Sequence, residues 1–117
     1  MANDKIFNMP FSKIYQLLID KVEKKGRTRE ELDQVTCWLT GYDKEQIDEL
    51  FAGDITYGDF FLHAPDLNPN RKLITGKICG IRVEEIEDPL MQEIRYLDKL
   101  VDELAKGKKM EKVLRTE

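Results

Sequence analysis

The stretch DPLMQEIRYLDKLVDELAKG, residues 88–107, decides the fold of this chain. Its apolar side chains recur every three or four residues, the period of one helix face, at Leu90, Ile94, Leu97, Val101 and Leu104. Asp88 and Pro89 are typical of a helix N-terminus, and Gly107 is typical of the residue just past a C-terminus. The stretch therefore predicts a long amphipathic helix around which shorter helices pack.

Two helices are expected in the first 40 residues. The first begins after Pro10, with Ser12 as its N-cap, and Gly26 ends it after an apolar stripe at Phe11, Tyr15, Leu18 and Val22. Thr28 and Glu31 then have the spacing of a capping box, in which each residue's side chain bonds the other's backbone. They predict a second helix, which ends at the next glycine.

Two further helices are expected before the prolines that interrupt the chain. Asp43 and Gln46 repeat the capping spacing and start a third helix before Gly53. A short fourth helix is predicted from about Thr56 to His63. Pro65 marks its end, because a proline disfavours helical geometry in the residue before it.

Residues 72–83 leave two alternatives open. A helix is favoured because the neighbouring segments are helical and three isoleucines have helical spacing, Ile74, Ile78 and Ile81. Gly76 and Gly80 would each cost that helix about 1 kcal/mol, and the β-branched residues also suit a small hairpin turning at Gly76–Lys77. The predicted fold class is all-α, a compact bundle of five or six helices, with this β-hairpin as the alternative for residues 72–83.

Length and charge favour one helical domain over residues 1–117, with an N-terminal arm at 1–10 and a basic C-terminal tail at 106–117. Nineteen Lys and Arg stand against 23 Asp and Glu, and this acidic balance argues against nucleic acid as a partner. No stretch approaches the roughly 20 apolar residues that span a bilayer, and no signal peptide is visible. We therefore expect a cytoplasmic protein that binds neither nucleic acid nor membrane.

Four strings stand out when the chain is read as a whole: NDKIFNMPF (3–11), WLTGY (38–42), ICGIRVEEIEDPL (78–90) and IRYLDKLVDEL (94–104). Together they resemble an uncharacterised bacterial family, domain of unknown function 2200, from the first residues to about Arg115. The resemblance implies a small stand-alone bacterial protein with no assigned activity, cofactor or catalytic residue.

Metal and cofactor motifs are not recognisable in the sequence. Cys37 and Cys79 form no CxxC pair, and the acidic cluster Glu84–Asp88 lacks the spacing of a calcium-binding loop. The segment Asp43–Glu49 follows a helix and turn as a DNA-recognition helix would, but its acidic side chains would repel a duplex. No metal and no cofactor are predicted.

Five residues are the candidates for a ligand pocket: Trp38, Tyr42, His63, Cys79 and Arg82. Trp and Tyr supply flat amphipathic walls, Arg82 could bind a carboxylate, and His63 could transfer a proton near neutral pH. Each also has a structural reading, with Trp38 in the core, His63 bonded at a helix end and Arg82 paired with a glutamate. The catalytic residues stay unknown, and so does whether the protein is an enzyme.

The function predicted from these observations is a helical protein-interaction module, with an unidentified protein or a second copy of the chain as partner. Its basic face at Arg95–Lys99 is one candidate docking surface, and Met91 and Leu100, beside the apolar stripe, could meet a second subunit. The alternative is a small-molecule-binding protein or enzyme built around Trp38, Tyr42, His63 and Arg82.

Overall fold

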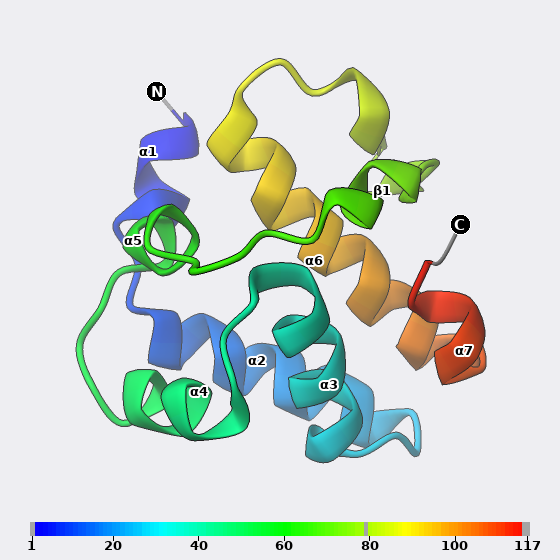
Figure 1. Cartoon of the computed structure of the whole chain (residues 1–117), viewed down its shortest axis with the longest axis horizontal. Coiled ribbons are helices and arrows are strands. Elements are labelled where there is room, and N and C mark those ends of the chain that lie inside the picture. Colours follow the sequence, from blue (N-terminus) through cyan, green and yellow to red (C-terminus); the bar gives the residue numbers. More distant parts are fainter. Residues whose placement is uncertain (1, 79, 116–117) are drawn as a thin grey trace.

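The computed structural model describes residues 2–78 and 80–115. In this part of the chain, seven α-helices, two short 3-10 helices and one two-stranded sheet follow one another (Figure 1). In chain order they are α1 (Ala2–Phe7), α2 (Phe11–Lys24), α3 (Arg29–Thr40), α4 (Lys44–Phe51), α5 (Tyr57–Leu62), η1 (Pro69–Leu73), β1 (Lys77–Ile78), β2 (Ile81–Arg82), η2 (Val83–Glu85), α6 (Pro89–Ala105) and α7 (Met110–Val113). The predicted helical bundle is confirmed.

Helix α6 is the element around which the others are arranged. It packs against α2, α3, α5, α7 and the hairpin (Figure 1). Four of its five stripe residues are fully buried, and Leu90 at the N-terminal end is half-buried. Asp88 caps the helix by accepting hydrogen bonds from the backbone N–H groups of Leu90 and Met91. The predicted central helix and its cap are confirmed.

The surface suggested for a second subunit lies inside this chain. Leu100 is 0% exposed and Met91 is 7% exposed. Both extend the apolar stripe that meets the surrounding helices, so the idea that they face a partner is wrong.

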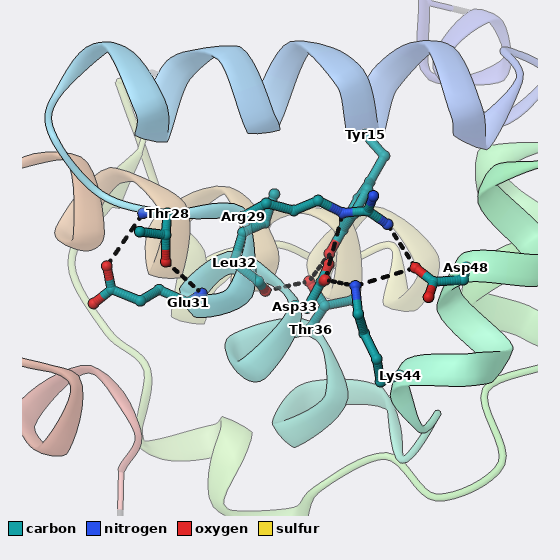
Figure 2. Close-up of polar contacts among 9 residues, drawn as sticks. All are labelled: Tyr15, Thr28, Arg29, Glu31, Leu32, Asp33, Thr36, Lys44 and Asp48. Carbon is teal, nitrogen blue, oxygen red and sulfur yellow. Dashed lines mark hydrogen bonds and ion pairs between the residues drawn. The ribbon is translucent and has the colours of Figure 1, made fainter.

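The capping pattern sets most of the shorter helices. Thr28 and Glu31 form the predicted capping box on α3, with both N–O distances at 3.2 Å (Figure 2). Asp43 and Gln46 form the second box, on α4. The Ser12 cap is wrong, because α2 begins at Phe11 with Pro10 as its N-cap residue. An isolated β-bridge between Pro10 and Thr56 fixes the backbone at Pro10, and the helix begins at the next residue, one position before Ser12.

Aromatic rings join α2, α5 and the α3–α4 connection. Phe60 stacks on Phe11 at a centroid distance of 4.1 Å and on Tyr42 at 4.8 Å. All three side chains are buried, so this end of the core is built from stacked rings.

The helix favoured for residues 72–83 is wrong, and the hairpin alternative is right. Strand β1 pairs antiparallel with β2, and the chain reverses between Ile78 and Ile81 rather than at Gly76–Lys77. The physical reason lies in two backbone conformations, since Gly76 has φ +105° and Gly80 has φ +80°, both outside the helical region. Lys99 of α6 holds the hairpin by donating to the carbonyl of Lys77 at 3.3 Å.

Both ends of the chain contribute structure. Residues expected as an N-terminal arm form α1, which packs against α5, and the basic tail contains α7 with Val113 fully buried. Helices α1 and α7 lie on opposite sides of the molecule in Figure 1. Among the described residues, no helix has the length and apolar character that a membrane span requires.

Candidate functional site

Two of the five predicted pocket residues are part of the core or its edge. Tyr42 is 7% exposed, and its hydroxyl donates a 2.8 Å hydrogen bond to the carbonyl of Phe60. Burial raises the pKa of Tyr42, so the hydroxyl stays protonated. Trp38 is half-buried against the core cluster.

The other predicted pocket residues lie in separate elements. His63 is exposed at the C-terminal end of α5, and Arg82 is exposed on β2. Cys79 lies outside the described residues. Three cavities, at α3–α4, at α7 and between α5 and α6, are lined by other residues than Trp38, Tyr42, His63 and Arg82, so the shared pocket of these four stays a prediction.

The basic face of α6 is engaged within the chain. Arg95 pairs with Asp98 at 2.9 Å, and Lys99 donates to the hairpin backbone. These contacts use hydrogen-bond donors of both side chains within the chain, so fewer donors remain for a docking partner.

A buried carboxylate joins three helices in what we call the Asp33 cluster, defined by Tyr15, Arg29, Asp33, Thr36, Lys44 and Asp48 (Figure 2). Asp33 lies on α3 and is charged, yet its side chain is only 3% exposed. Its Oδ1 accepts a 2.5 Å hydrogen bond from the hydroxyl of Tyr15 on α2, and its Oδ2 accepts one from Nζ of Lys44 on α4. Arg29 Nε lies 3.4 Å from the same Oδ2.

The charges of the Asp33 cluster are matched. Asp48 receives Arg29 at 2.7 Å and Lys44 at 3.1 Å, so two cations meet two carboxylates (Figure 2). Burial, followed by the hydrogen bond to Asp33, raises the pKa of Tyr15 far above the neutral range. The hydrogen bond to Asp33 also raises the pKa of Lys44. Neither group exchanges a proton near neutral pH, so the cluster is a link between helices.

A cavity of about 390 Å³ lies beside the Asp33 cluster and is lined by Glu30, Asp33, Gln34, Cys37 and Lys44. Burial and then the nearby carboxylates of Asp33 and Asp43 raise the pKa of the Cys37 thiol. A protonated thiol is a poor nucleophile and a poor metal ligand. Within residues 2–78 and 80–115, no three His, Cys, Asp or Glu side chains are grouped as metal binding requires.

A second cavity of about 430 Å³ lies at α7 and is lined by Lys108, Glu111, Lys112, Leu114 and Arg115. The arginine of this cavity is already paired within the chain, since Arg115 makes two hydrogen bonds, at 2.5 and 2.7 Å, to the carboxylate of Glu103. Lys108 lies 3.7 Å from the same carboxylate, and Lys112 is exposed.

The third cavity, about 260 Å³, has a different character and is called the α5–α6 hollow. Its lining comes from the end of α5, the following loop, η1 and the first turns of α6: Phe61, Leu62, Leu67, Arg71, Pro89, Leu90 and Glu93. Five of these seven are apolar, and Leu62 is 65% exposed. The α5–α6 hollow therefore joins a mostly apolar lining to one large exposed apolar side chain.

One ion pair lies in the wall of the α5–α6 hollow. Arg71 donates from Nε to Oε1 of Glu93 at 2.9 Å, and from one terminal nitrogen to the carbonyl of Asn68 at 3.0 Å. The Glu93 side chain is 10% exposed, and its second oxygen, Oε2, is buried without a hydrogen-bond partner among the described residues. An unsatisfied buried carboxylate oxygen costs free energy, and Oε2 is therefore an acceptor that the described part of the chain leaves unused.

Sequence reasoning missed Arg71 and Glu93. A signal was present, because Glu93 is three residues after Leu90 and four before Leu97, which places its carboxylate on the apolar face of α6. Arg71 gives no such signal, since only the folded chain brings η1 to α6.

The fold and the site define a small helical domain with an open apolar hollow. Over residues 5–115 the chain matches the family described as "Uncharacterized protein conserved in bacteria (DUF2200)", and it belongs to that family. It is also similar to a crystal structure of uncharacterized protein SP1917, with 58% sequence identity and a TM-score of 0.91. That similarity covers 94% of this chain and 90% of the other. A comparison with curated proteins finds no match.

Proposed function

We propose that this protein is a helical protein-interaction module that docks a partner segment in the α5–α6 hollow. The observation that carries the proposal is Leu62, which is 65% exposed at a hollow whose other lining is mostly apolar. Burying such a side chain against a partner removes apolar surface from water, the main favourable term in protein association.

The charge around the α5–α6 hollow favours a basic partner. Four exposed acids are within three positions in sequence of a lining residue: Asp59, Asp66, Glu87 and Asp88. The exposed basic residues in the same sequence windows are Lys72 and His63, and Arg71 is paired with Glu93. A segment with an apolar side chain flanked by lysine or arginine therefore complements both the shape and the charge of this surface.

Three short peptides test this proposal by fluorescence anisotropy. One has a leucine flanked by lysines, the second has the same leucine flanked by glutamates, and the third has alanine in place of leucine between lysines. We expect saturable binding of the first peptide and much weaker binding of the other two. Equal binding of all three, or of none, would contradict the proposal.

A pair of matched variants locates the binding surface. Leu62→Asp should abolish binding of the lysine-flanked leucine peptide, because it places a charge at the hollow. Leu17→Asp is the control, since Leu17 is 57% exposed on α2, which does not line the hollow. Loss of binding in both variants would argue against a specific site.

The other predictions for this protein keep their own tests. A homodimer requires twice the monomer mass in light scattering at several concentrations, and a monomeric mass throughout would end that idea. A ligand of the Trp38, Tyr42, His63 and Arg82 group should raise the melting temperature in a metabolite screen. The cytoplasmic location also stays a prediction.

A further inference from the structure

We infer that the group docked in the α5–α6 hollow is an indole, the side chain of a tryptophan in the partner segment. This inference rests on the proposed function and specifies the chemistry of the anchor. It follows from two features that must be satisfied together, an apolar wall and a single unpaired acceptor at Glu93.

The apolar wall selects a large hydrophobic group. Phe61, Leu62, Leu67, Pro89 and Leu90 line a hollow of about 260 Å³, and Leu62 is mostly exposed until something covers it. Aromatic side chains bury the largest apolar area with little loss of conformational freedom, and they are enriched among the residues that dominate binding energy.

The unpaired acceptor selects a donor at the edge of that group. Glu93 Oε1 is occupied by Arg71, whereas Oε2 has no partner in the described part of the chain. Glu93 lines the hollow, and the terminal torsion of glutamate is broad. The proposed contact requires the carboxylate to turn far enough to bring the covered Oε2 to a group seated there. A carboxylate can only accept, and the indole Nε1–H can only donate.

The same pair disfavours a cation in the interior of the hollow. Arg71 lies next to Glu93 and already neutralises its charge, so a buried ammonium would meet the guanidinium as a like charge. A neutral N–H donor satisfies Oε2 without adding charge. Cations of the partner belong at the rim, near Asp66 and Asp88, where water remains.

The other buried glutamate of α6 provides a matched control. Glu103 is 8% exposed, close to the 7% of Glu93. Arg115 binds both carboxylate oxygens of Glu103, at 2.5 and 2.7 Å, and Glu103 does not line the hollow. Glu93→Gln and Glu103→Gln therefore make the same chemical change at two similarly buried sites, only one of which faces the proposed ligand.

The experiment titrates the full chain with indole and with 1-methylindole, which keeps the ring but lacks the donor. Leucine methyl NMR signals of Leu62, Leu67 and Leu90 report binding. We expect indole to shift these signals saturably and 1-methylindole to bind at least about tenfold more weakly, the ratio expected for a hydrogen bond to a charged acceptor.

Glu93→Gln should remove that discrimination. Arg71 needs the amide oxygen as its acceptor, so the amide NH₂ group replaces Oε2 and offers a donor in place of an acceptor. Glu103→Gln should keep the indole preference, and circular dichroism melts establish that both variants are folded.

Two results would overturn the inference. One is equal binding of indole and 1-methylindole, or no binding of either, to the wild-type protein. The other is a preference for indole that survives Glu93→Gln. If lysine-flanked leucine peptides still bind at Leu62, the proposed function stands while the indole inference falls; if they also fail, both fall.

Discussion

The hydroxyl of Tyr15 donates a 2.5 Å hydrogen bond to Oδ1 of Asp33, across the interface between α2 and α3 (Figure 2). Both residues are buried, Tyr15 at 0% and Asp33 at 3% exposed. A second buried tyrosine, Tyr57, has a hydroxyl with no hydrogen-bond partner among the described residues. The two tyrosines differ in whether the hydroxyl is used.

Tyr15→Phe should destabilise the protein by about 1–3 kcal/mol, because it removes a donor from a buried carboxylate. Urea unfolding at neutral pH measures the change. Tyr57→Phe is the control and should change the free energy of unfolding by less than about 0.5 kcal/mol, since the lost hydroxyl bonds nothing there. Equal losses for both variants would show that the Tyr15–Asp33 bond is not a specific tie between helices.

Glycine at position 41 should be far less replaceable than glycine at position 26, although both have φ +83°. A Cβ on Gly41 would lie 2.7 Å from backbone atoms of Asp66, whereas nothing lies within 4 Å of a Cβ on Gly26. Gly26→Ala should cost about 1 kcal/mol from the left-handed conformation alone, and Gly41→Ala roughly 2–4 kcal/mol.

Urea unfolding of these two variants checks that expectation. Similar losses would mean that the loop carrying Asp66 moves away freely, in which case the packing between α3 and this loop is not fixed.

Glu31 should make stability depend on pH in the acidic range. The hydrogen bonds from Arg27 lower the pKa of Glu31 in the folded protein. The unfolded chain therefore takes up the proton first as pH falls, and the stabilisation present above the ordinary glutamate pKa of about 4.3 is lost below it.

Glu31→Gln should flatten this part of the stability profile, measured by urea unfolding at a series of pH values. Glu30→Gln makes the same change of charge at an exposed neighbour with no ion pair among the described residues, and should keep the acid-induced loss. A wild-type slope in Glu31→Gln would assign the loss to other carboxylates.

Local sequence signals predict most of this fold because its helices are defined by short-range rules. Asp88, Thr28 and Asp43 each cap the helix that follows them, and the period of the α6 stripe matches its burial. The prediction that Ser12 caps α2 is wrong because a contact distant in sequence, the bridge between Pro10 and Thr56, sets where α2 begins.

Long-range contacts explain the rest of what sequence could not predict. The hairpin at 77–82 is tied to α6 by Lys99, which is 22 residues from the carbonyl that it binds. The Arg71–Glu93 pair likewise joins η1 to α6 across 22 residues. Secondary-structure propensity and hydrophobic periodicity describe one segment at a time, so neither predicts contacts between residues this far apart in sequence.

The most direct test of the docking proposal locates the bound peptide. The lysine-flanked leucine peptide is synthesised with a nitroxide spin label and added to the protein, and the leucine methyl signals are recorded. We predict strong broadening of Leu62, Leu67 and Leu90, with the signals of Leu17 unchanged. Broadening centred on Leu17, or no selective broadening at all, would contradict the assignment of the α5–α6 hollow as the binding surface.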